Sequence, residues 1–404
     1  MLGQELINRY DHAQIAYSPY SMTTEILEAA RDWSARLPAY SAEFESQRRL
    51  SSEVSHEFAK AGFFHMLVPK EYGGFEVHPK TFIEVLKQIA IGDGSAGWNV
   101  MIGATTGLLS ASLPVKFARE IYGTGPGTLT VGVTAPLGRA NKVEGGYRVS
   151  GRWPFASGSQ NADWICGGSF IFDNDAQVLN DKGNPDIHLM MFKASEIEIE
   201  DTWNVVGLKG TGSHHFHVDN HFVPEGRSVI LGGRSVVKAP LYQFPMLGLL
   251  ALGVSSVSLG IGYHALEVFK ELAGVKKPTG SRRNLTERPL IQADVARSLA
   301  DLKSAEAFIR EAIDEAWAVA EKGERLGTQI KANLRLAAVN ATHKSVAAVD
   351  RLYQAGGGSS IYEDNLLQRC FRDIHVTTQH IMVATPVYEV VGRVELGLPP
   401  RSLL

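Results

Sequence analysis

Residues 151–164, near the middle of the chain, read GRWPFASGSQNADW and connect two segments with strand-like patterns. In the preceding segment, residues 143–151, apolar or aromatic side chains alternate with polar ones around a Gly-Gly turn, which predicts a β-hairpin. The following segment, residues 164–172, reads WICGGSFIF and predicts another strand. The chain is therefore expected to turn at residues 151–164 within a β domain.

The same turn carries groups that suit a flat ligand. Ser157 and Ser159 provide hydroxyls, Gly158 exposes backbone N–H groups, and Trp153 provides an indole ring. Together they suit a planar heteroaromatic ring with polar edges. Taken alone, a polar turn beside core tryptophans is the simpler interpretation, so the rest of the chain has to decide between the two.

The composition describes a globular protein with more than one structural unit. A chain of 404 residues exceeds what one hydrophobic core usually supports, so two or three units are expected. Hydrophobic residues make up 44% and charged residues 21%, and the net charge of -3 gives no indication of nucleic-acid binding. Because only Cys166 and Cys370 occur, and residues 1–10 lack a secretion signal pattern, we expect a cytoplasmic location.

One apolar run, residues 244–269, is long enough to span a membrane. Glycine, serine and histidine residues interrupt it repeatedly. Such small residues suit a helix that packs closely against other helices. We therefore expect this segment to be a core helix, and no membrane contact.

The spacing of apolar residues divides the chain into three domains. The period is helical in residues 1–126, alternating in residues 127–238, and helical again in residues 239–404. The expected fold class is α+β, with an N-terminal helical domain, a central β-sandwich or barrel, and a C-terminal helical bundle. The expected helices are 53–62, 82–90, 95–109, 293–322, 328–354 and 365–391, and the expected strands are 128–135, 164–172, 189–192 and 216–224.

Two glycine clusters are most simply turns. Residues 123–127 lead into a strand, and neither they nor residues 356–358 precede a Lys-Ser or Lys-Thr pair, so dinucleotide-fold and P-loop motifs are excluded. The triple glycine could still let the backbone approach a phosphate. Arg282 could meet a phosphate or lie in a solvated loop.

Other familiar sites receive little support. His215, His217 and His221 would share one face of a strand, but no cysteine or carboxylate completes a familiar metal-binding spacing, so no metal is expected. No G-x-S-x-G elbow occurs, which argues against a serine hydrolase.

Five stretches, in order along nearly the whole chain, resemble motifs of the acyl-CoA dehydrogenase superfamily. They are residues 62–74 (GFFHMLVPKEYGG), residues 92–98 (GDGSAGW), residues 207–213 (GLKGTGS) with Val223-Pro224, Gly356-Gly357, and Arg372-Asp373. The resemblance implies a helical domain, a central β domain and a C-terminal four-helix bundle.

Departures from these motifs indicate the branch. An acyl-CoA dehydrogenase needs a carboxylate to remove the α-proton of a thioester, and the family positions for it fall at residues 376–381 and 253–254, which contain no acid. The family's Thr-Glu-Pro turn is replaced by residues 135–138, which read APLG. A thioester-oxidising acyl-CoA dehydrogenase-type flavoenzyme with a relocated base stays an alternative.

Residues 151–158 and 372–380 instead resemble the flavin-dependent monooxygenase branch, the oxygenase components of two-component systems. The resemblance implies that reduced FMN or FAD (FMNH2 or FADH2) reacts with O2 to give a C4a-hydroperoxide, which hydroxylates an aromatic or heteroaromatic small molecule. Because the chain has no nicotinamide-binding fingerprint, a separate NAD(P)H:flavin reductase would supply the reduced flavin. Oxygenation at nitrogen or sulfur, and a scaffold that has lost the flavin, stay alternatives.

The resemblance also implies residue roles. Ser157 would hydrogen-bond the flavin near N5 or its oxygen adduct. His380 would lie near the reacting carbon, where an unperturbed pKa of about 6.5 suits proton transfer near neutral pH, with His375 as the alternative acid or base. Trp98 and Trp153 would wall the flavin and substrate. The implied cofactor-binding residues are Trp153, Phe155, Ala156, Ser157, Ser159, Arg282, Gly356, Gly357 and Arg372, and the implied substrate-binding residues are Trp98, Asn99, His375 and Gln379.

The resemblance finally implies a homotetramer built as a dimer of dimers. In such an assembly Arg282 and residues 356–358 would reach the flavin phosphate of a neighbouring subunit.

Overall fold

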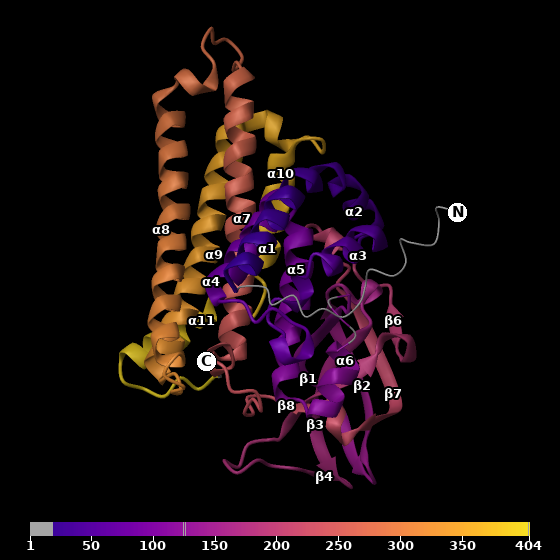
Figure 1. Ribbon diagram of the computed structural model, residues 1–404. Coiled ribbons are helices and arrows are strands. Elements are labelled where there is room, and N and C mark those ends of the chain that lie inside the picture. Colours follow the sequence, from indigo (N-terminus) through magenta and orange to yellow (C-terminus); the bar gives the residue numbers. More distant parts are fainter. Residues whose placement is uncertain (1–18, 124, 126, 403) are drawn as a thin grey trace, which may run out of the picture.

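The computed structural model of the protein describes residues 19–123, 125, 127–402 and 404. Figure 1 shows the long helices α7, α8 and α9 side by side, the sheet at the other side of the molecule, and the N-terminal helices between them. The N-terminal helices are α1 (Pro19–Arg36), α2 (Ser41–Gln47), α3 (Ser52–Lys60), α4 (Pro79–Gly92), α5 (Gly94–Gly107) and α6 (Val115–Tyr122). The three predicted units therefore follow one another along the chain, helical, β and helical.

Helix α5 lies at the centre of this arrangement. Nearly all of its residues are buried, and it packs against α4, α7, α10 and β1. Asp93 caps its first turn, since the carboxylate accepts a hydrogen bond from the Ala96 N–H at 2.9 Å. Because α5 is buried on nearly all sides, it belongs to the core shared by the three units.

The central unit is one open eight-stranded sheet with the order β6-β7-β2-β1-β3-β5-β8, and β4 pairs with β3. The predicted hairpin is confirmed by the β1–β2 pair, and β1 and β3 run parallel, so the sheet is mixed. The hydrogen bonds join all strands into one mixed sheet, which is the central β domain that the sequence predicted. Register shifts in β1 on both sides of Pro136 bend it. The strands are β1 (Thr130–Val143), β2 (Gly146–Ala156), β3 (Trp164–Asp173), β4 (Ala176–Gln177), β5 (Ile187–Lys193), β6 (Glu198–Glu200), β7 (His214–Pro224) and β8 (Ser228–Ile230).

The C-terminal unit is a bundle around α7. Its helices are α7 (Met246–Val275), α8 (Pro289–Ala320), α9 (Thr328–Gly356), α10 (Leu366–Thr377) and α11 (Pro386–Glu395). Helix α7 is long and apolar enough to cross a membrane, but 83% of its apolar window is buried inside the protein. Its glycines and serines permit this packing, so the expectation of a core helix is confirmed.

The predicted helix 365–391 is wrong in its length, because a turn at residues 378–385 divides it into α10 and α11. The Thr377 and Thr378 hydroxyls bond to carbonyls of the last turn of α10, and Pro386 begins α11. Proline suits the start of a helix and disfavours its continuation from the preceding turn. The break places His380 in a turn at the end of α10.

The two predicted domain boundaries stay predictions. The boundary at 126/127 falls between α6 and β1, and the boundary at 238/239 falls between β8 and α7.

Candidate active site

A chain of buried hydrogen bonds joins the N-terminal helices to the sheet. The Trp98 indole N–H on α5 donates to the Ser157 hydroxyl at 3.0 Å. The Ser157 oxygen lies 2.6 Å from the Ser213 hydroxyl, which lies 2.7 Å from the Thr211 hydroxyl. All four side chains are buried. Trp98 and Ser157, both predicted for the site, are thus in direct contact. Thr211 and Ser213 were not predicted, although they belong to the stretch 207–213 quoted above.

His380 meets this chain from the C-terminal unit. Its ring centroid lies 5.6 Å from that of Trp98, with the rings at 71°. The Nδ1 atom accepts a hydrogen bond from the Met382 backbone N–H at 3.3 Å, so the proton of the neutral ring is on Nε2. Within the described residues Nε2 has no hydrogen-bond partner, which leaves it available to a ligand.

Burial, and then the Arg335 guanidinium on α9, lower the pKa of His380 to about 4. The sequence-based value of about 6.5 is therefore wrong, because buried surroundings disfavour the charged imidazolium. At neutral pH His380 is an uncharged hydrogen-bond donor through Nε2. No carboxylate of the described chain contributes to the shift, and the sequence alone did not single out Arg335.

The turn that follows β2 fits a planar ring with polar edges. The Phe155 side chain is 65% exposed at a φ of +67°, edge-on to Trp203. The Ser159 hydroxyl is buried, and no described residue bonds it. Gly158 has a φ of +77°, and a Cβ there would lie 2.7 Å from the Asn99 side-chain oxygen. An exposed aromatic face and an unsatisfied hydroxyl, four residues apart in the chain, suit the ring of a flavin.

Ala156 and Asn99 occupy supporting positions beside this turn. Ala156 is fully buried at the end of β2. The Asn99 amide N–H group donates to the Ser95 and Gly210 carbonyls, at 2.9 and 3.3 Å. Asn99 therefore ties α5 to the segment that carries Thr211.

Trp153 lies outside this cluster, contrary to the sequence-based assignment. It is fully buried in the sheet domain, stacks on Phe216 at 4.7 Å between ring centroids, and donates its indole N–H to the Gly168 carbonyl at 2.7 Å. A Cβ on Gly151 or Gly167 would collide with its ring, so these glycines make room for it. Trp153 is a core residue of the β domain, as the simpler interpretation of the turn had it.

Three further predicted residues have partners of their own. Arg372 is bound by Glu45, Gln368 and the Val206 carbonyl. The His375 Nε2 atom lies 2.9 Å from Asp350. Gln379 is exposed and bonds Thr378.

Arg282 and the triple glycine belong to the C-terminal bundle. Arg282 is exposed and belongs to the segment between α7 and α8. Figure 1 shows this segment at the end of the bundle away from the sheet. Gly356 ends α9 nearby, where its carbonyl accepts a hydrogen bond from Lys276. Gly357 follows with a φ of +55°. The structure brings these residues to one end of the bundle without joining them to the Ser157 cluster.

The strand histidines pair with glutamates of the neighbouring strand and loop. The His217 Nδ1 atom lies 3.1 Å from Glu200, and the His221 Nε2 atom lies 3.5 Å from Glu196. Among the residues that the structure describes, no group of three or more histidine, cysteine or acidic side chains is arranged to hold a metal ion.

Comparison with known proteins identifies the family. Residues 22–120 match the acyl-CoA dehydrogenase N-terminal domain, and residues 252–385 match the acyl-CoA dehydrogenase C-terminal domain. An indole-3-acetate monooxygenase from Pseudomonas putida is 34% identical over 93% of both chains. A flavin-dependent monooxygenase oxygenase subunit, HsaA, from Mycobacterium tuberculosis is 30% identical over 89% of this chain and 92% of its own.

A solved structure agrees with the sequence relatives. The structure of XiaF from Streptomyces sp., in complex with FADH2 and glycerol, matches with a TM-score of 0.88 at 26% identity, over 95% of this chain and 98% of its own. The chain belongs to the acyl-CoA dehydrogenase family, and within it to the flavin-dependent monooxygenases.

Proposed function

We propose that the protein is the oxygenase component of a two-component system that hydroxylates an aromatic or heteroaromatic small molecule. FMNH2 or FADH2 would supply the chemistry by activating O2 as a C4a-hydroperoxide. One observation carries the proposal: a hydroxyl, Ser157, and an uncharged imidazole, His380, both contact the buried Trp98 ring. The relatives named indole-3-acetate monooxygenase and flavin-dependent monooxygenase support the aromatic substrate and the flavin.

The Ser157 hydroxyl is prepared to donate its proton to a ligand. A hydroxyl has one proton and two lone pairs. Trp98 donates to one lone pair of Ser157, and the Ser213 hydroxyl can donate to the other while it accepts from Thr211. This arrangement leaves the Ser157 proton for an acceptor on the flavin or on its oxygen adduct.

His380 supplies a second donor without adding charge. Because its pKa is lowered to about 4, the Nε2–H group persists through neutral pH. No acid occupies residues 376–381 or 253–254, where the dehydrogenases of this family carry their base. Two neutral donors beside the buried Trp98 ring would stabilise a polar oxygen group, without a carboxylate to remove its proton.

The remaining partners follow from the same proposal. A separate NAD(P)H:flavin reductase supplies the reduced flavin, in line with the word subunit in the name of HsaA. Arg282 and Gly356-Gly357 approach the flavin phosphate of a neighbouring subunit in a homotetramer. Both cysteines are buried and unpaired, which suits the cytoplasmic location that we propose.

The test is turnover with a separate reductase, NADH, flavin and indole-3-acetate or resorcinol as probe substrates. We expect a hydroxylated product that retains one oxygen atom from 18O-labelled O2. Reduction of bound oxidised flavin by an acyl thioester without O2 would instead establish the dehydrogenase. A purified protein that binds no flavin in either redox state would show a scaffold.

A further inference from the structure

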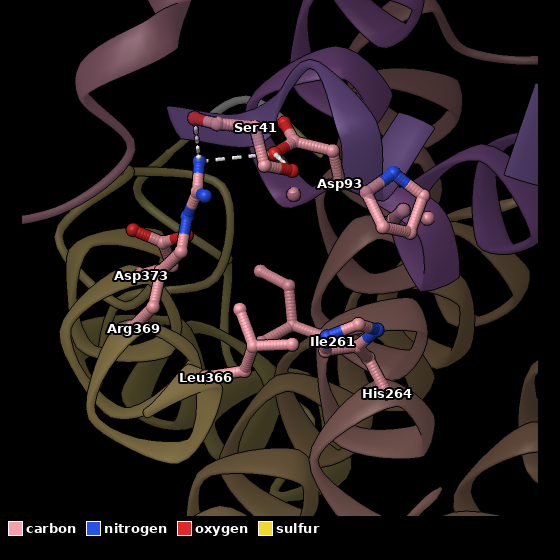
Figure 2. A pocket seen from close by; sticks show the side chains of 11 residues that line it. Ser41, Asp93, Ile261, His264, Leu366, Arg369 and Asp373 are labelled. Atoms are coloured by element: carbon pink, nitrogen blue, oxygen red, sulfur yellow. Dashed lines mark hydrogen bonds and ion pairs between the residues drawn. The ribbon is translucent and has the colours of Figure 1, made fainter. Parts of the chain in front are cut away.

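A cluster of buried charges lies beside the hydrogen-bond chain and is shown in Figure 2. The Arg369 guanidinium lies 3.0 Å from the Asp93 carboxylate and 3.8 Å from that of Asp373, and it donates to the Ser41 carbonyl at 2.8 Å. The Ser41 hydroxyl donates to Asp93 at 2.7 Å. Together with His264 these side chains line a cavity of about 30 Å³.

Each acidic member of the cluster holds the start of a segment that leads to the active site. Asp93 caps α5, the helix that carries Trp98. Asp373 accepts a hydrogen bond from the Leu208 N–H at 2.6 Å, at the start of the segment that carries Thr211 and Ser213.

Arg369 joins these two segments to a third. It belongs, like Asp373, to α10, whose C-terminal end leads into the turn that contains His380. The guanidinium therefore connects the segments that carry Trp98, Ser213 and His380.

We propose that Asp93, Arg369 and Asp373 are positioning residues, which hold the segments of Trp98, Ser213 and His380 in the arrangement that oxygenation requires. The proposal rests on the oxygenase function proposed above. No hydrogen bond or ion pair of the described chain joins these three residues to the turn after β2, to Trp98 or to Ser157. They therefore act through the segments that they hold in place.

The backbone at Leu208 supports this role. Leu208 is a non-glycine residue with a φ of +49°, a conformation that surrounding contacts must enforce. The Asp373 carboxylate accepts a hydrogen bond from the Leu208 N–H group, and the Trp203 indole N–H donates to the Leu208 carbonyl at 3.2 Å. Asp373 thus helps to fix the backbone conformation at Leu208. This conformation precedes the residues Thr211 and Ser213, which belong to the hydrogen-bond chain that includes Ser157.

The charges of the cluster balance, which argues for a structural task and against an ion site. Asp93 and Asp373 face Arg369, and the adjacent Glu45 faces Arg372 and Lys209. Buried ion pairs stabilise a fold less than apolar residues of the same volume would, whereas the planar guanidinium fixes direction. The buried charges are therefore better explained by a role in fixing the relative positions of the segments than by a role in stabilising the fold.

Asparagine variants separate the ion pair from the backbone contacts. In Asp93→Asn the amide oxygen can still cap α5, because asparagine caps as well as aspartate. In Asp373→Asn the amide oxygen can still accept the hydrogen bond from the Leu208 N–H group. Both variants remove one charge opposite Arg369. The matched control is Asp301→Asn, which removes a carboxylate paired with Lys344 and Arg351 between α8 and α9.

Two readouts distinguish positioning from stability and from the proposed function itself. Hydrogen–deuterium exchange of residues 207–213 and 378–385 in the flavin-free protein needs no activity. The yield of hydroxylated product per reduced flavin consumed reports the site. We expect Asp93→Asn and Asp373→Asn to speed exchange in these segments, and to lower the yield about tenfold to a hundredfold at a thermal midpoint like that of Asp301→Asn.

Several outcomes would overturn the proposal. Unchanged exchange and yield in both variants would do so, and so would an equal loss of yield in Asp301→Asn. If an asparagine variant fails to fold, the test is Arg369→Lys, which keeps the positive charge but loses the planar guanidinium. This variant must show the faster exchange, or the proposal is wrong. Absence of product from the wild-type protein would refute the oxygenase function, while the exchange data would still decide the positioning role.

Discussion

At the scale of single residues, Ser157 links α5 to the segment that carries Ser213 through its two side-chain hydrogen bonds. Ser157→Ala removes the acceptor of the Trp98 N–H and the donor offered to the flavin, and it leaves a buried N–H unpaired. We expect the free energy of unfolding to fall by about 1–3 kcal/mol. We expect the yield of hydroxylated product to fall about 100-fold, as for loss of one preorganised donor.

The control for this change is Ser345→Ala, which removes a buried serine that bonds only within α9. Urea unfolding and product analysis of both variants check the expectation. Equal yields from the two variants would remove Ser157 from the mechanism.

His380 predicts a specific dependence on pH. Its pKa is lowered to about 4 in the folded protein, against about 6.5 when unfolded. The unfolded chain therefore binds the proton first, so the stability that the neutral ring contributes is present above pH 6.5 and is lost as the pH falls through 4. His380→Asn should flatten the acid side of the unfolding profile between about pH 6.5 and 4.

The measurement is urea unfolding of wild type and His380→Asn across this range. We also expect the product yield of the wild type to change smoothly with pH near 6.5. His380→Asn should therefore remove no inflection there. An inflection of that kind would mean that the ring titrates as an exposed imidazole.

The residue scale also shows what the sequence could and could not predict. Trp98, Ser157 and His380 were named from motifs, and the structure brings them together. Trp153 was named on the same grounds, but it is a core residue, because an indole that stacks in a sheet and one that lines a pocket look alike in a sequence. The pKa of His380 was missed because burial is a tertiary property.

At the scale of elements, the turn after β2 depends on a glycine. Gly158→Ala would place a methyl group 2.7 Å from the Asn99 oxygen at a φ of +77°. Gly145→Ala is a matched control, because Gly145 has a φ of +76° with no atom within 4 Å of the added Cβ. We expect the control to lose only the backbone cost of about 1–2 kcal/mol.

Gly158→Ala should lose more stability than the control, and it should weaken reduced-flavin binding where the control does not. Unfolding midpoints and flavin titration measure both effects. Equal losses in the two variants would show that the Asn99 contact is not tight.

Sequence patterns predicted most elements because their periods are local. The hairpin, α5 and the long helices α8 and α9 are confirmed near their expected bounds. The division of residues 365–391 was missed, since apolar residues continue on both sides of the turn. The strand order was not predicted, because strand pairing, including the parallel β1–β3 pair, is long-range.

At the scale of the whole molecule, the assembly is a prediction. Arg282 and Gly356-Gly357 belong to the C-terminal bundle, and we expect them to approach the flavin phosphate of a neighbouring subunit. We expect sedimentation to give a tetramer, and Arg282→Ala to weaken flavin binding about tenfold without changing the unfolding midpoint. A monomer that binds flavin with wild-type affinity would contradict this assembly.

The central claim is that this chain controls the reaction of reduced flavin with O2. The direct measurement mixes the protein, loaded with reduced flavin without air, with oxygenated buffer and follows the return of oxidised-flavin absorbance. We predict a slower return than for free reduced flavin, faster in Ser157→Ala and unchanged in Ser345→Ala. Return at the rate of free flavin in the wild type would contradict the account.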